Sequence, residues 1–341
     1  MRVWFALSLA LVSSVACHRS RVEAAAGEGA VDDPRLDFRP TPWIPFSPAF
    51  DTPPRAVAFD ALCADTVDHC RASCGTQSDS LSFAACALAL RYGDDEASLE
   101  LARTLFDSSG VVVGIETQPT VDAGYLGKLA ISPAPPVGPY RHHLAWVVDS
   151  FRTVEATFSA LVPQAPRPIM FRTRPHALRF YKTESRSFPS AWAMDGIVAY
   201  NVEGPLYEER DGVAATMFHE LFHLNDQGHE RWSERVLDGL YHRIIERCDN
   251  HEDCLTPYAP DDARVEGGTF YALDRRTNDV REYAADVALR WFREHEAVLR
   301  SEPLGAPPFR CATPENLEAW TLVVDEFFGG VDLVPSCSNE T

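Results

Sequence analysis

Apolar positions recur at two different spacings along the second half of the chain. Between residues 143 and 161 they fall on one helical face, a period that predicts an amphipathic helix. Two further helices are predicted at 213–225, after an Asp-Gly pair, and at 279–300, after a Thr-Asn pair. Short apolar runs at 168–171 and 197–200 predict strands. This order of elements indicates a mixed α+β fold.

The preceding segment has a different pattern. Residues 58–108 are helical in their apolar spacing and rich in cysteine. The apolar run at 111–115 predicts a strand, and a breaker-rich join follows at 133–139. We therefore expect a small, disulfide-stapled helical subdomain at 58–135, followed by a larger domain at 136–341.

The N-terminus has the form of a targeting segment. Arg2 precedes an uncharged apolar run, Val3–Ala16, which is too short to span a bilayer as a helix. A positive residue followed by such a run predicts a signal peptide at residues 1–16. The chain is therefore expected to be exported.

The residues after this run resemble a bacterial lipobox, in which a cysteine is lipidated and becomes the mature N-terminus. Ala16 and Cys17 fit that pattern, whereas Ser14 stands where leucine is usual, and plain signal-peptidase cleavage is the alternative. The proline-rich stretch at 17–57 is expected to be a tether between the lipid and the folded body. The resemblance implies an outer-membrane or cell-surface lipoprotein attached through Cys17; otherwise the protein is secreted.

Cysteine usage agrees with export. The chain has nine cysteines, and setting Cys17 aside leaves eight, which suggests four disulfides in an oxidising compartment. Local spacing favours the pairs Cys248–Cys254 and Cys311–Cys337. Two more bridges fall within the group Cys63, Cys70, Cys74 and Cys86, whose connectivity stays open. A zinc site in that group is the alternative, but it contains no CxxC pair.

Charge excludes one class of partner. The formal net charge of −19 repels phosphate backbones, which argues against nucleic-acid binding. Solubility is the simplest interpretation of such a surface. The arginines between the predicted helix 143–161 and the predicted strand 197–200 are interpreted as a solvated strand face. They are Arg167, Arg172, Arg174 and Arg179.

The predicted helix 213–225 contains an HExxH sequence running from His219 to His223. Residues i and i+4 lie one turn apart on the same face, so both imidazoles can reach one cation. Glu220 lies beside them, positioned to take a proton from a metal-bound water. The alternative is a partly buried helix whose histidines only form hydrogen bonds.

The third predicted helix offers the groups that would complete a metal site. Three protein ligands and a water are typical of catalytic zinc, and two histidines with one glutamate form one of its standard sets. Glu282 is the candidate third ligand. Asp286, one turn further on, can accept the second N–H of a ligating histidine.

HExxH followed some tens of residues later by ExxxD resembles the gluzincins, the thermolysin-like clan of zinc peptidases. The resemblance covers about residues 140–300. It implies a zincin-like catalytic domain with an active-site helix and a small mixed sheet, and Zn²⁺ held by His219, His223 and Glu282. It further implies Glu220 as general base, and a peptide or protein as substrate.

The segment before Glu282 resembles that of lethal-factor-type peptidases. The shared series is Phe270-Tyr271-Ala272, Thr277-Asn278 and Glu282-Tyr283-Ala284. In that family a tyrosine before the glutamate ligand hydrogen-bonds the developing oxyanion, which implies a catalytic role for Tyr271. The separation between tyrosine and glutamate is longer here, so Tyr283 is the alternative donor. A packed loop aromatic is the other interpretation of Tyr271.

His229 competes for the third ligand position. It follows His223 by six residues, the spacing of the metzincin third histidine. However, Asp226 occupies the midway position where metzincins need glycine, and no methionine follows residue 217. We expect a surface histidine in a polar turn.

Two functions of different classes remain. The first is a zinc hydrolase that cleaves peptide bonds, which agrees with a strand at 197–200 placed to pair with an extended substrate. The second is a non-catalytic, metal-binding surface lipoprotein. Glu220 favours the first, because a structural metal site has no use for a free carboxylate between its ligands.

Overall fold

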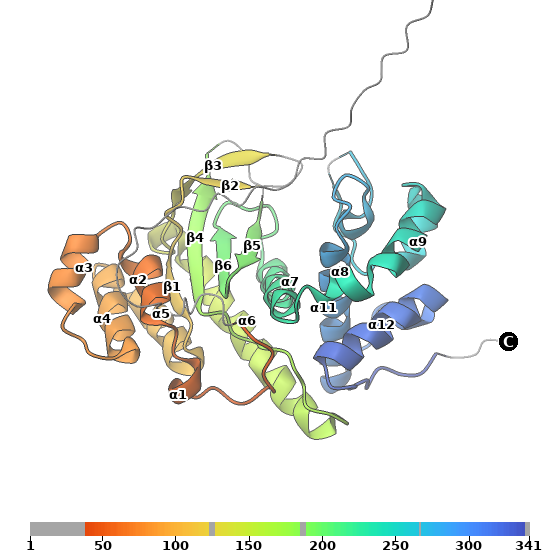
Figure 1. Ribbon diagram of the computed structural model, residues 1–341, viewed down its shortest axis with the longest axis horizontal. Coiled ribbons are helices and arrows are strands. Elements are labelled where there is room, and N and C mark those ends of the chain that lie inside the picture. The colour runs from red at the N-terminus through yellow and green to blue at the C-terminus, as the bar shows by residue number, and fades with distance from the viewer. Residues whose placement is uncertain (1–37, 123–126, 185–188, 266, 338–341) are drawn as a thin grey trace, which may run out of the picture. The chain divides into compact units, whose positions relative to one another are not determined.

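The computed structural model describes residues 38–122, 127–184, 189–265 and 267–337. A six-stranded mixed sheet lies at the centre of this part of the chain (Figure 1). The strands are β1 (Val112–Ile115), β2 (Thr120–Asp122), β3 (Lys128–Pro133), β4 (Ala177–Thr183), β5 (Ala191–Met194) and β6 (Ile197–Asn201). Their order is β2-β3-β4-β6-β5, with β1 pairing with β4. β1 and β6 run parallel to β4, whereas β3 and β5 are antiparallel to their neighbours.

Helices precede, interrupt and follow the strands. They are α1 (Pro48–Asp51), α2 (Arg55–Cys63), α3 (Val67–Cys74), α4 (Ser80–Tyr92), α5 (Glu96–Ser109), α6 (Arg141–Leu161), α7 (Arg210–Gly228), α8 (Trp232–Val236), α9 (Asp238–Cys248), α10 (Glu252–Leu255), α11 (Val280–Leu299) and α12 (Pro314–Phe327). Short 3₁₀ turns lie at η3 (Gly138–Tyr140), η4 (Val162–Gln164), η5 (Thr256–Tyr258), η6 (Tyr271–Leu273) and η7 (Phe309–Cys311). The predicted α+β class is confirmed.

Alternation along β4 separates two faces of the sheet. Leu178 and Phe180 belong to the large core that the helices share, whereas Tyr181 belongs to a smaller cluster with residues of β3. Successive strand residues point to opposite faces of a sheet, so the buried strand β4 contributes side chains to both clusters. α6 and α7 pack on one another, and α7 also packs on β5 and α11. The sheet thereby positions the helix that carries the HExxH sequence.

The predicted elements at 111–115, 143–161, 197–200, 213–225 and 279–300 are confirmed as β1, α6, β6, α7 and α11. The strand predicted at 168–171 is wrong.

The backbone of that apolar run finds partners outside the sheet. Met170 N–H donates to Phe327 O at 3.0 Å. The Asn225 side chain accepts from Arg172 N–H at 2.7 Å and donates to Arg172 O at 2.9 Å. Phe171 is fully buried, with its ring stacked between those of Phe158 and Phe218. The run is apolar because a helical core surrounds it.

The segment expected as a helical subdomain shares its sheet and core with the rest. The described residues belong to one compact unit. β1, from the 58–135 segment, lies directly beside β4. The packing there is close, because a Cβ on Gly114 would lie 2.0 Å from Ala61 O. Only a residue without a side chain allows α2 to approach β1 in this way.

The expected signal peptide at 1–16, Cys17 and the start of the tether lie outside the described residues. The later part of the tether, 38–57, is packed against the body: Phe38 is buried, and Trp43 N–H donates to Ile169 O at 2.7 Å. Within the described ranges no helix combines the length and apolar character needed to cross a membrane.

All eight described cysteines pair at disulfide distance. The expected pairs Cys248–Cys254 and Cys311–Cys337 are confirmed. The group left open by the sequence forms Cys63–Cys70 and Cys74–Cys86. Its cysteines are therefore not grouped as a metal site, and four such pairs are compatible with an extracellular protein.

Candidate metal centre

α7 is apolar on almost every side, which is typical of a helix enclosed by other elements. Met217, Phe218, Leu221, Phe222 and Leu224 are buried around its circumference. His219 and His223 are the exceptions: both side chains keep 13% exposure on the face toward α11. A helix surrounded by core in this way holds its polar face in a fixed direction.

α11 presents the facing carboxylates. Its N-terminus is capped by Asp279, whose side chain accepts from Arg281 N–H at 3.0 Å and fixes where the first turn begins. Glu282 lies in that first turn and Asp286 one turn later. The ring of Phe292 stacks on that of Phe218 at 4.4 Å between centroids, which joins α11 to α7.

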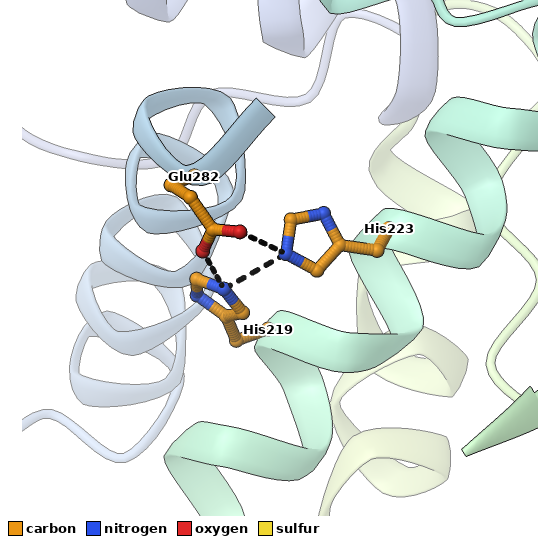
Figure 2. Close-up of side chains that lie close together, drawn as sticks. All are labelled: His219, His223 and Glu282. Carbon is orange, nitrogen blue, oxygen red and sulfur yellow. Dashed lines mark hydrogen bonds and ion pairs between the residues drawn. The ribbon is translucent and has the colours of Figure 1, made fainter. Parts of the chain in front are cut away.

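His219, His223 and Glu282 converge on one point between the two helices (Figure 2). The two Nε2 atoms lie 3.0 Å apart, His219 Nε2 lies 3.0 Å from Glu282 Oε2, and His223 Nε2 lies 3.5 Å from Glu282 Oε1. Ligands at zinc bond lengths of 2.0–2.1 Å in a tetrahedron are about 3.3 Å apart. Both the donor types and their separations therefore fit a zinc ion.

Asp286 lies where the sequence placed a supporting acid. His219 Nδ1 and Asp286 Oδ1 are 2.9 Å apart. A proton on Nδ1 donates to this carboxylate and leaves the Nε2 lone pair directed at the shared point, which is the tautomer a metal ligand needs. This contact fixes the orientation of the His219 ring.

The charged groups of the cluster shift one another's pKa values toward the ionised forms. Burial opposes ionisation of Glu282, but His223 and His219 outweigh it and hold the Glu282 pKa well below its usual range. Burial likewise opposes a charged His219, whereas hydrogen bonds from its ring to Asp286 and Glu282 raise the His219 pKa well above its ordinary value. The centre is therefore an acceptor-rich site that favours a positive charge at its middle.

Glu220 is buried with one carboxylate oxygen unused. It is 6% exposed, and Oε2 has no hydrogen-bond partner in the described part of the chain. Burial raises the Glu220 pKa, while the neighbouring His223 and His219 lower it. A desolvated carboxylate next to two metal-ligand candidates is a competent proton acceptor.

The two candidate tyrosines lie in different surroundings. The Glu282 charge is the main cause that raises the pKa of Tyr271 well above its usual value, followed by burial and by Glu220. Tyr283 is fully buried on α11, and its pKa is raised first by burial and then by the charges of Glu315 and Glu318. The carboxylates of the cluster thus act on the Tyr271 hydroxyl, whereas acids of α12 act on that of Tyr283.

His229 is not part of the cluster. It caps the C-terminal end of α7, with Nδ1 2.6 Å from Glu326 Oε1 and Nε2 3.2 Å from Met170 O. Both ring nitrogens are engaged in these contacts. The expected surface position is wrong, because His229 is only 8% exposed and packs on the ring of Phe327.

Sequence reasoning missed two tyrosines near Glu220. The Glu220 charge contributes to raising the pKa values of Tyr181 and Tyr207, after burial. Tyr181 comes from β4 and Tyr207 from the loop before α7, and both are buried. They come near Glu220 only through folding, so no spacing in the sequence marks them.

The interpretation of 197–200 as a substrate-binding edge is wrong. β6 lies between β4 and β5, so the edge strand is β5. Asn201 N–H donates to Ser190 O, so these two opposite residues form a hydrogen-bonded pair. Hydrogen-bonded and non-hydrogen-bonded pairs alternate along an antiparallel ladder. The backbone groups of Ala191 and Ala193 therefore point away from β6. Gln227 Nε2 already donates to Ala193 O at 3.1 Å.

A second buried charged cluster lies elsewhere in the fold. Arg174 is 4% exposed and lies 3.2 Å from Asp51 Oδ2 and 3.4 Å from Glu155 Oε1. Arg179 is also buried and lies 3.6 Å from Glu116 Oε2. The solvated strand face expected for these arginines is therefore wrong at both positions.

Comparisons with known proteins give no match. No protein family fits the chain, and neither the curated proteins nor the solved structures contain a significant relative.

Proposed function

We propose that the protein is a zinc-dependent hydrolase with a zincin-like catalytic domain, and that it cleaves peptide bonds. The observation that carries the proposal is the convergence of His219, His223 and Glu282, whose ligand atoms lie within 4.8 Å of one another. Asp286 supports it, because its contact fixes the His219 tautomer. Zn²⁺ is the cofactor proposed for this donor set.

A bound Zn²⁺ supplies Lewis-acid chemistry, which polarises a carbonyl and acidifies water. In this proposal the Glu220 carboxylate accepts a proton from the attacking water and returns it to the leaving amine. The Tyr271 hydroxyl keeps its proton and donates a hydrogen bond to the developing oxyanion. A non-catalytic site would not need the unpartnered Glu220 Oε2 beside the ligands.

The substrate is proposed to bind as an extended strand along β5. Among the described residues no hydrogen bond engages the outward-facing N–H and C=O of Ala191 or the N–H of Ala193, which suits them to β-strand addition. Gln227 occupies the Ala193 carbonyl and ends the open edge there. We further propose that the enzyme is exported and anchored through Cys17, with four disulfides formed in that compartment.

The test joins metal content to cleavage of an unfolded, fluorescently labelled protein by the full chain. The wild-type chain should carry about one zinc, as a three-ligand site requires. Glu220→Gln should keep the zinc and the fold but lose on the order of 10²–10⁴ in rate, because an amide cannot accept the proton.

Glu230→Gln is the matched control, since Glu230 is exposed just beyond α7 and should be dispensable. Unchanged hydrolysis by Glu220→Gln would eliminate the peptidase proposal. A chain that carries zinc but cleaves no unfolded protein would instead support the non-catalytic, metal-binding lipoprotein.

A further inference from the structure

The segment that joins the N-terminus to the folded body is apolar and uncharged. From Pro40 to Phe50 the sequence reads PTPWIPFSPAF, without one charged residue in a chain that is 24% charged. Two of its large apolar side chains face solvent: Phe50 is 78% exposed and Ile44 is 46% exposed. Phe50 is the most exposed large hydrophobic residue in the described part of the chain.

This segment is held in place rather than loosely attached. The buried Arg174 guanidinium donates to Ile44 O at 2.6 Å and pairs with Asp51 at 3.2 Å, so both ends of the turn converge on one side chain. Ser47 N–H also donates to Asp51 Oδ2 at 3.0 Å. The backbone that carries Ile44 and Phe50 is therefore fixed to the body by Arg174.

Glycines allow the close docking of this segment. A Cβ on Gly110 would lie 2.5 Å from Asp51 O and 3.0 Å from the ring of Phe46. A Cβ on Gly228, in the last turn of α7, would lie 2.2 Å from Phe38 O. The glycines let the backbone of this segment pack closely on the body. The side chains of Ile44 and Phe50 add little to folding stability, because they stay in water.

We propose that Ile44 and Phe50 form a membrane-contact patch that inserts into the surface of a lipid bilayer. Residues 40–50 carry no charge, so inserting them into lipid buries no ionised side chain, and a zwitterionic bilayer does not repel a chain of net charge −19. Aromatic and aliphatic side chains beside proline are the residues that enter the interface between headgroups and acyl chains.

The position of the patch in the chain supports the same occupant. Cys17, the expected lipid attachment point, precedes Phe38 by 21 residues. Such a length spans at most about 70 Å when fully extended, so the patch stays within reach of the membrane that would hold the lipid.

The first test uses the full chain in phosphatidylcholine vesicles that contain a photoactivatable phospholipid. Peptide mapping after illumination should find lipid adducts between residues 43 and 50. Adducts confined to other segments, or none in the described part of the chain, would overturn the proposal. Cross-links between two chains at Phe50 would assign the patch to a second copy instead and overturn it as well.

The second test removes the lipid attachment point and measures flotation with the same vesicles. In a Cys17→Ser background, Ile44→Ser with Phe50→Ser should reduce vesicle binding about tenfold or more, because two large apolar side chains lose their burial in lipid. Leu81→Ser with Leu317→Ser is the matched control, since those leucines are 40% and 47% exposed on α4 and α12.

Both double variants should unfold at the wild-type urea concentration, because all four side chains are exposed in the fold. Equal loss of binding in the two variants would show general hydrophobic adhesion and reject a specific patch. The outcome does not depend on hydrolysis, so it stands apart from the proposed enzyme activity.

Discussion

Two clusters of charged groups within the described part of the chain differ in the kind of group at their centre. Around Arg174, the carboxylates of Asp51 and Glu155 surround a guanidinium that the chain itself provides. Between α7 and α11, His219, His223 and Glu282 direct acceptor atoms at one another across 3.0–3.5 Å. A buried cluster with its own cation serves the fold, whereas a cluster of acceptors around a shared point favours a cation from outside.

The largest expected effect comes from removing the internal cation. Arg174→Met leaves the partly buried carboxylates of Asp51 and Glu155 without their cation, and breaking a buried ion pair costs about 3–5 kcal/mol of unfolding free energy. Urea denaturation measures this loss. Zinc bound per folded chain should stay at the wild-type value. A parallel loss of zinc from the folded fraction would show that the two clusters are not independent.

Removing an acceptor from the other cluster should affect stability only when metal is present. Zinc at a thousandfold excess over its dissociation constant stabilises a single-site protein by about 4 kcal/mol. The wild-type chain should show this gain in thermal melts, and Glu282→Ala should lose most of it. His229→Ala should keep the gain, because His229 contacts Glu326 and Met170 instead of the cluster. The reverse result would move the third ligand to His229.

Two tyrosine variants test which hydroxyl acts at the candidate metal centre. Tyr271→Phe should lower hydrolysis by roughly 10²–10³, the effect of removing one oxyanion donor. Tyr283→Phe should leave the rate within a fewfold of wild type, since its buried hydroxyl has no hydrogen-bond partner among the described residues. Steady-state kinetics decide between them, and a damaging Tyr283→Phe would reassign the donor.

A smaller effect, on the pH dependence of stability, is expected from His295, which is buried in its neutral form. His295 is fully buried, with Nδ1–H donating to Trp291 O and Nε2 accepting from Leu333 N–H. Burial lowers the His295 pKa to about 4, while Asp332 raises it and Arg310 lowers it further. The unfolded chain, with a histidine pKa of about 6.5, therefore binds the proton more readily.

Because the folded-state pKa is the lower one, stability is retained above about pH 6.5 and lost as the pH falls toward 4. Between pH 7 and pH 5 this group should cost about 2 kcal/mol, and His295→Gln should remove that part of the slope. Urea denaturation at the two pH values measures the difference. An unchanged slope would mean that His295 is charged in the fold.

The sequence predicted the residues that converge in the candidate metal centre better than it predicted their surroundings. His219, Glu220 and His223 are neighbours on one helix, so helical spacing alone fixes their relation. Glu282 and Asp286 also lie one turn apart on their own helix. The sequence could not show that the two helices pack together, which depends on contacts such as Phe218 with Phe292.

The errors arise where a partner is distant in sequence. The apolar run at 168–171 looks like a strand, yet Asn225 and Phe327 supply its backbone hydrogen bonds. Arg174 looks like a surface residue, yet Asp51 and Glu155 bury its charge. A local pattern reports that a residue has polar or apolar character, and only the fold determines which other residue satisfies it.

The four cysteine pairs join residues that are close in sequence, with separations of 7, 12, 6 and 26 residues. None of these pairs links α7 to α11, so no covalent bond within the described chain holds the two halves of the metal centre together. Thiol reductants and chelators consequently act on separate parts of the molecule. Reduction should loosen α2–α4 and the segments around Cys248 and Cys311 first, while chelation should remove the proposed metal ion, which would cross-link α7 to α11.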